Sequence, residues 1–136
     1  MSFDSIKLVL PWPVSANRYW RHISHPSTGR PITLVSKEAK AYREEVGWLA
    51  RAAGCPAPVD YAIELRLRLV PKGGVCMDLD NALKVMIDAL KGILFVDDAQ
   101  VRKIIAERAD GDGRARLEVE IRKFVPEPAP IFARSA

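Results

Sequence analysis

The segment from Tyr61 to Val70 alternates between aliphatic and charged residues. Aliphatic side chains occupy the odd positions 63, 65, 67 and 69, and charged side chains occupy positions 64, 66 and 68 between them. Successive side chains of a strand point to opposite faces of a sheet, so this period predicts a β-strand with one apolar face. The other face would be solvated, as is common in sheets with antiparallel pairing. The fold must therefore include a sheet with one polar side.

Three other segments are predicted to be strands. Ser5–Leu10 alternates in the same way and is ended by Pro11 and Pro13. Segments 100–109 and 114–123 are also predicted strands. The residues between them, Asp110–Gly113, form a strong β-hairpin turn sequence, so these two strands are expected to pair directly. Ile93–Val96 is predicted to be a short extended piece, which could carry Asp98 towards Asp78 and Asp80 if it runs back beside the preceding helix.

Two helices are predicted between these strands. Ser36 suits the N-cap of a helix over residues 37–53. A second helix is predicted to begin near Asp80, itself a good N-cap, and to end at Gly92. Residues 15–31 are expected to be a long loop, and residues 126–136 a loose Pro/Ala-rich tail. The predicted order is β-α-β-α-β-β, a single α+β domain with two helices on a mixed sheet.

Composition excludes several classes of protein. A chain of 136 residues suits one domain, and it carries a moderate net charge of +4. Cys55 and Cys76 form no paired motif and the chain has two histidines, so a zinc site is not expected. We expect two reduced thiols in a cytoplasmic protein. No signal peptide and no apolar run long enough to span a membrane is recognised.

Aspartates and one lysine concentrate around the second predicted helix. Asp78 and Asp80 precede it or open it, Lys84 and Asp88 follow at helical spacing, and Asp97-Asp98 comes after it. Carboxylate oxygens are the ligands that Mg²⁺ prefers, and a basic protein with such a group suits phosphodiester chemistry. The same residues also suit an ordinary structure: a helix cap, a solvated i,i+4 ladder and a turn. Spacing alone leaves both interpretations open.

Basic and aromatic residues are interleaved in the predicted loop. Its basic residues are Arg18, Arg21, His22, His25 and Arg30. Phosphate contacts and base stacking would use such a mixture, so Arg18 and Arg21 are predicted to contact DNA. Tyr19 and Trp20 could stack on bases or anchor the loop to the core, and the sequence leaves this open. Trp48, on the apolar side of its helix, is assigned to the core or to a dimer interface. Arg66 and Arg68 are assigned to a solvated face.

Two separated motifs resemble the RusA family of Holliday junction resolvases. The first is Asp78-x-Asp80-Asn81-xx-Lys84-xxx-Asp88-x-Leu90-x-Gly92, followed by Asp97-Asp98-x-Gln100-Val101. The second is the N-terminal run Pro11-Trp12-Pro13-Val14-Ser15-Ala16-Asn17-Arg18-Tyr19-Trp20-Arg21. The resemblance covers roughly residues 5–124. It implies an endonuclease domain over residues 1–125, with the tail outside it.

The resemblance implies a homodimeric endonuclease that uses Mg²⁺, with Mn²⁺ as a substitute, and cuts two strands of a four-way DNA junction symmetrically. Asp78, Asp80 and Asp98 match the catalytic, metal-binding aspartates, and Lys84 matches the essential lysine. Three residues are expected beside these ligands: Asp97, Asn81, which would orient the start of the helix, and Asp88, which would pair with Lys84. The residues expected to contact DNA are Asn17, Arg18, Tyr19, Arg21 and Lys72.

One segment departs from the family pattern. Relatives often place several arginines just before the first aspartate, where this chain has Lys72-Gly73-Gly74-Val75-Cys76-Met77. Val75 and Met77 would either pack within the loop or insert between bases at the junction centre.

The resulting hypothesis is a metal-dependent junction resolvase acting in DNA recombination and repair. Two alternatives remain at this point: a junction- or duplex-binding module without chemistry, and a metal-dependent enzyme for small phosphorylated compounds. The chain has no glycine-rich phosphate loop, which argues against the last of these.

Overall fold

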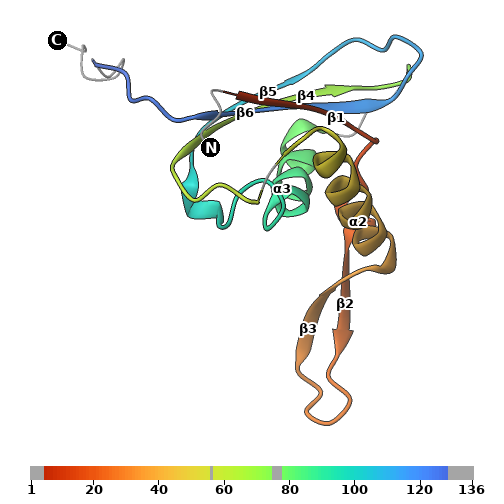
Figure 1. Cartoon of the computed structure of the whole chain (residues 1–136). Helices are drawn as coiled ribbons and strands as arrows, with labels where there is room; N and C mark the ends of the chain where they lie inside the picture. The colour runs from red at the N-terminus through yellow and green to blue at the C-terminus, as the bar shows by residue number, and fades with distance from the viewer. Residues whose placement is uncertain (1–4, 56, 75–77, 129–136) are drawn as a thin grey trace, which may run out of the picture.

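A mixed four-stranded sheet forms the centre of the fold (Figure 1). The structure is a computed structural model that describes residues 5–55, 57–74 and 78–128. The strands lie in the order β1 (Ser5–Leu10), β6 (Arg116–Lys123), β4 (Ile63–Val70) and β5 (Val101–Arg108). β6 pairs antiparallel with both β1 and β4, whereas β4 and β5 are parallel. The predicted first strand and the central alternating strand are both confirmed.

Two long helices cover the same face of this sheet, α2 (Lys37–Ala52) and α3 (Leu79–Leu90) (Figure 1). The aliphatic side chains of β4 at positions 63, 65, 67 and 69 are buried beneath them. The predicted cap of the first helix is confirmed, because the Ser36 hydroxyl oxygen accepts a hydrogen bond from the Ala39 amide. Among the described residues, no helix has both the length and the apolar composition needed to cross a bilayer.

The predicted loop over residues 15–31 is wrong. The structure places there a short helix α1 (Ala16–Tyr19) and a strand β2 (Trp20–Ser24), which pairs with β3 (Pro31–Val35). This two-stranded hairpin projects away from the sheet and the helices (Figure 1). Polar and turn-forming residues hid the strands, because much of the ribbon is exposed on both faces and therefore lacks the alternation of a half-buried strand.

The predicted β5–β6 hairpin is also wrong, because β4 lies between the two strands. The connection containing Asp110–Gly113 crosses the end of β4 instead of forming a tight turn. It is held there by hydrogen bonds from Ala109 N to Leu69 O, 2.9 Å, and from Gly113 N to Lys72 O, 2.9 Å. A Cβ atom on Gly111 would stand 2.7 Å from the Gly73 Cα, so this crossing requires glycine. The alternating β4 is buried between two neighbours, and that non-local pairing overrides the local turn sequence.

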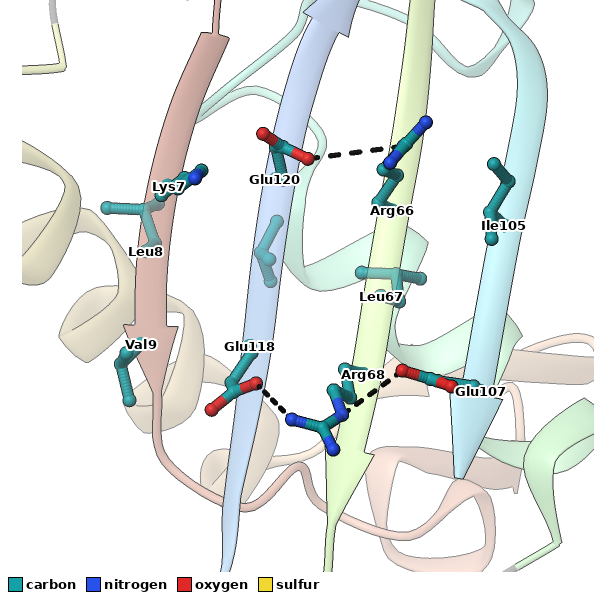
Figure 2. A pocket seen from close by; sticks show the side chains of 11 residues that line it. Lys7, Leu8, Val9, Arg66, Leu67, Arg68, Ile105, Glu107, Glu118 and Glu120 are labelled. Atoms are coloured by element: carbon teal, nitrogen blue, oxygen red, sulfur yellow. Dashed lines mark hydrogen bonds and ion pairs between the residues drawn. The ribbon is translucent and has the colours of Figure 1, made fainter. Parts of the chain in front are cut away.

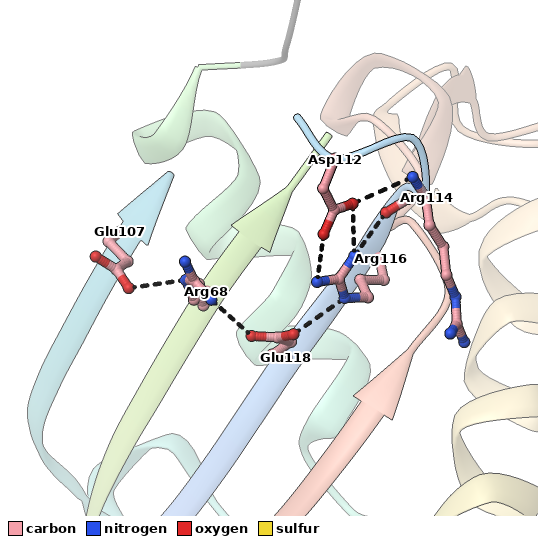
Figure 3. A network of polar contacts seen from close by, with 6 residues as sticks. All are labelled: Arg68, Glu107, Asp112, Arg114, Arg116 and Glu118. Atoms are coloured by element: carbon pink, nitrogen blue, oxygen red, sulfur yellow. Dashed lines mark hydrogen bonds and ion pairs between the residues drawn. The ribbon is translucent and has the colours of Figure 1, made fainter. Parts of the chain in front are cut away.

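The outer face of the sheet is polar, as the charged positions of β4 predicted. A shallow hollow of about 400 Å³ lies on it, lined by side chains of all four strands (Figure 2). Arg68 bridges Glu107 at 3.1 Å and Glu118 at 3.4 Å (Figure 3). Arg116 in turn contacts Glu118 at 3.0 Å and Asp112 at 2.9 Å. Guanidinium groups on this face already have carboxylate partners, so it is a poor surface for phosphates.

Two further sequence assignments are decided by burial. Trp48 of α2 is 62% exposed, so its assignment to the core is wrong, and an interface is the alternative that remains. Its ring contacts the Arg51 guanidinium, 5.4 Å from the ring centroid. Cys55 is a free, half-buried thiol, and burial raises its pKa. Cys76, like Val75 and Met77, lies outside the described residues.

Candidate active site

Helix α3 presents the first part of the acidic motif. Asp78 occupies the N-cap position without a side-chain capping bond, and Asp80 lies in the first turn. The helix begins at Leu79, one residue before the predicted start near Asp80, and Asp80 is not its N-cap. Met86, Ala89 and Leu90 are buried against the core, whereas Asp80 and Lys84 are exposed on the opposite side of the helix. The helix ends at Leu90, and Gly92 follows with a φ of 82°, as its position after the helix predicted.

The second part of the motif returns to α3 through a turn. Ile93–Val96 is not the predicted extended piece, because residues 92–94 form a turn in which the Ile93 and Leu94 amides donate to the Leu90 carbonyl oxygen at 3.1 and 2.9 Å. Phe95, which follows, is fully buried and forms an isolated bridge with Val59. Asp97 caps a short 3₁₀ helix, η1 (Asp98–Gln100), with a capping box to Gln100. This turn brings the Asp98 side chain to the cavity described next.

Gln100 fixes this turn through four hydrogen bonds. Its amide nitrogen donates to the Val59 and Tyr61 carbonyl oxygens at 2.8 and 2.9 Å. Its amide oxygen accepts from the backbone N–H groups of Val96 and Asp97, both at 2.8 Å. The sequence motif includes Gln100 but gives no sign of this bonding role, because the partners at positions 59 and 61 are distant along the chain.

One cavity joins the two parts of the motif. It has a volume of about 340 Å³ and is lined by Trp20, Lys84, Ile87, Asp88, Asp98, Val101 and Ile104. Lys84 and Asp88 come from α3 and Asp98 from η1, so residues separated by the turn after α3 line the same cavity. Trp20 comes from the start of β2, at the base of the projecting hairpin.

Contacts inside the cavity differ from the expected ones. Asp88 accepts a short hydrogen bond from the Tyr19 hydroxyl, and no ion pair with Lys84 is found among the described residues. The predicted Asp88–Lys84 pair is therefore wrong. The Lys84 ammonium instead lies over the Trp20 ring, 5.2 Å from its centroid. Burial, and then the hydrogen bond to Asp88, raise the pKa of Tyr19, so its hydroxyl stays protonated and donates.

Lys91 is the nearest cation to the η1 aspartates. Its ammonium is 3.5 Å from an Asp97 carboxylate oxygen and 3.9 Å from one of Asp98. All three side chains are exposed, so these pairs hold the carboxylates loosely. Nothing in the sequence motif pointed to Lys91, which directly follows the last residue of α3.

The three candidate metal ligands suit a hard divalent cation in their chemistry, because Asp78, Asp80 and Asp98 are all exposed carboxylates. Their positions, however, do not form a complete metal site. Within residues 5–55, 57–74 and 78–128, no group of three His, Cys, Asp or Glu side chains stands close enough to hold an ion. The structure thus places Asp98 in the lining of the same cavity as Lys84 and Asp88 but does not assemble all three carboxylates of the described chain.

The residues expected to contact DNA are divided between surface and core. Asn17, Arg18, Arg21 and Lys72 are exposed, and Arg18 contacts Glu38 at 2.8 Å. Tyr19 is 0% exposed, so of its two possible roles the structure shows the anchor to the core. A DNA strand cannot reach its side chain in this conformation.

The chain is similar to proteins of known kind over most of its length. The profile of the family Endodeoxyribonuclease RusA matches residues 11–122. Two relatives, from Escherichia coli and Enterobacteria phage 82, are each named crossover junction endodeoxyribonuclease RusA. Each is 36% identical over 119 residues, which cover 87% of this chain and 94% of the relative. A third, from Shigella sonnei, is 35% identical over the same shares. The chain therefore belongs to the RusA family of endodeoxyribonucleases.

Proposed function

We propose that this protein is a crossover junction endodeoxyribonuclease that resolves four-way DNA junctions with a divalent metal, by hydrolysing one phosphodiester bond in each of two strands. The observation that supports this most is the cavity that Lys84 and Asp98 share, in a chain that matches the family over residues 11–122. The endonuclease domain would span residues 1–125, followed by a tail. It would act on DNA in the cytoplasm.

Asp78, Asp80 and Asp98 would hold the metal, Mg²⁺ or Mn²⁺ in its place. When bound, such an ion supplies a more acidic water and neutralises charge on the scissile phosphate. Because the described residues hold no assembled set of three, the proposal includes that these carboxylates come together only on binding. Asp97 and Asn81 would flank them. Asp97 supports Asp98 by capping η1.

Lys84 would hold the scissile phosphate and stabilise negative charge as the bond breaks. An ammonium on a four-carbon stem offers three donors to phosphate oxygens. Lys84 lies one helical turn from Asp80 and in the same cavity as Asp98, so a phosphate held by it would lie beside the proposed ligands. The products would be a 5′-phosphate and a 3′-hydroxyl.

The β2–β3 hairpin would contact a DNA arm. The chain contains no aspartate or glutamate between Asp4 and Glu38, whereas Arg21 and Arg30 are exposed on this ribbon. An isolated two-stranded ribbon is marginally stable in water, and a DNA groove accommodates a ribbon of this width. Arg18, Asn17 and Lys72 would add phosphate contacts near the cavity.

A homodimer would supply the two active sites that paired cuts require. The exposed ring of Trp48 on α2 supports an interface there, because tryptophan is enriched among residues that dominate interface energies. Trp48→Ala is expected to weaken self-association in sedimentation equilibrium at least tenfold. An unchanged association constant would exclude this helix face from the interface.

The decisive experiment is incubation of the protein with a labelled four-way junction and Mg²⁺, with linear duplex as the substrate control. We expect paired nicks in the junction only. Asp80→Asn and Asp98→Asn should each abolish nicking while junction binding persists. Glu107→Gln, on the outer face of the sheet and opposite the helices, is the matched control and should cut normally. A protein that binds the junction and leaves it intact with Mg²⁺ would be a binding module instead.

A further inference from the structure

Trp20 contacts the lysine on which the proposed chemistry depends. Its ring lies 5.2 Å from the Lys84 ammonium, and both side chains line the cavity that Asp98 enters. A cation over the face of an indole ring is attracted by the ring quadrupole, most strongly where water is excluded. The contact links the first motif of the chain to the second, since Trp20 follows α1 and Lys84 lies in α3.

Tyr19 fixes the orientation of this ring. Its own ring meets that of Trp20 edge to face, with centroids 4.7 Å apart and an interplanar angle of 62°. Its side chain is fully buried, and its hydroxyl donates to Asp88, one turn beyond Lys84. The backbone is also held, because the Ser36 amide donates to the Tyr19 carbonyl at 2.8 Å. Successive turns of α3 are thus contacted by successive residues, Trp20 and Tyr19.

We propose that Trp20 is a positioning residue that holds the Lys84 ammonium ready for the scissile phosphate. A lysine side chain is flexible, and Lys84 has aspartates four residues before and after it that would otherwise attract it. A carboxylate partner would compete with the phosphate for the ammonium, whereas the indole ring is uncharged. This inference rests on the proposed role of Lys84.

Base stacking is the alternative use of Trp20. It is disfavoured because the ring already has Lys84 over one face and packs edge to face with Tyr19, and it is only partly exposed. The two roles predict opposite effects of substitution. Loss of a stacking residue weakens junction binding, whereas loss of a positioning residue slows cutting and leaves binding unchanged.

The test compares Trp20→Leu and Trp20→Phe with wild type and with Ile105→Ala, a control truncation on the outer sheet face. Single-turnover cutting of a labelled junction with Mg²⁺ measures the rate, and binding with Ca²⁺ in place of Mg²⁺ measures the affinity. We expect Trp20→Leu to cut at least tenfold more slowly, with affinity within twofold of wild type. Trp20→Phe should recover most of the rate, because a phenyl face also attracts a cation.

A spectroscopic measurement tests the geometry without activity. Protons on the Lys84 Cε should resonate upfield in wild type because of the Trp20 ring current, and this shift should vanish in Trp20→Leu. If Trp20→Leu fails to fold, the ring-current shift of Lys84 in wild type still decides. An unshifted Lys84, or a Trp20→Leu variant that cuts at the wild-type rate or loses rate only through weaker binding, overturns the inference. A wild-type protein that never cuts the junction overturns the proposed function instead.

Discussion

Ser36 joins the base of the hairpin to the start of α2, and its removal should be costly. The side chain is 7% exposed and makes two hydrogen bonds. Its oxygen accepts from the Ala39 amide at 3.1 Å, and its hydroxyl donates to the Arg18 carbonyl at 2.6 Å. Ser36→Ala removes both bonds without changing the backbone.

The magnitude follows from these two bonds. Loss of an N-cap hydroxyl costs about 1 kcal/mol. Leaving a half-buried carbonyl without its donor costs about 1–2 kcal/mol more. The free energy of unfolding should therefore fall by about 2–3 kcal/mol, which for a chain of this size lowers the thermal midpoint by roughly 6–10 °C.

Urea unfolding followed by far-UV circular dichroism, at one protein concentration, measures this loss. Ser27→Ala is the control, since within the described residues that hydroxyl hydrogen-bonds only His25, at the exposed tip of the hairpin, and its loss should cost less than about 0.5 kcal/mol. Equal stability of Ser36→Ala and wild type would refute this assignment of the two bonds.

Three other predictions concern DNA binding, acid stability and a buried hydroxyl. Replacing Arg21 and Arg30 by glutamine should reduce the slope of log affinity against log salt by about 1.8 for duplex DNA, and an unchanged slope would remove the hairpin from the DNA interface. The Arg66 guanidinium, 2.7 Å from Glu64, lowers the pKa of that carboxyl. The ionised Glu64 carboxylate contributes to stability above the ordinary glutamate pKa, and this contribution is lost as the pH falls through the lowered value. Glu64→Gln should therefore make the free energy of unfolding depend less on pH in the acidic range. The Tyr61 hydroxyl is buried without a hydrogen-bond partner in the described part of the chain. Tyr61→Phe should therefore raise the free energy of unfolding by up to about 1 kcal/mol. A loss of stability would indicate that the hydroxyl has a partner.

Local sequence patterns predicted the features that nearby residues specify. The N-cap at Ser36, the glycine after α3 and the alternation of β4 each specify their element through nearby residues, and each prediction agreed with the structure. The β5–β6 pairing failed because turn residues describe a change of direction and not which strand lies alongside. The β2–β3 hairpin was missed because a ribbon exposed on both faces has no apolar period.

The candidate site also contains residues that local spacing predicts and residues whose positions depend on contacts distant in the sequence. Asp80, Lys84 and Asp88 share a helical spacing, which a sequence displays directly. The arrival of Asp98 at the same cavity depends on the turn that Gln100 fixes through two distant carbonyls. The aromatic contacts of Lys84 and Asp88 join segments more than sixty residues apart, and the family motifs mark these residues without saying that they touch.

The order of strands has a consequence for how the protein emerges from the ribosome. In the described sheet, the first strand has only one neighbour, β6, which is the last strand to be synthesised. A nascent chain that has completed α3 and the aspartates after it still lacks the strand that joins β1 to β4. The nuclease domain can therefore complete its sheet only after Arg116–Lys123 has left the ribosome, and chains truncated before Arg116 should remain incompletely folded and open to proteolysis.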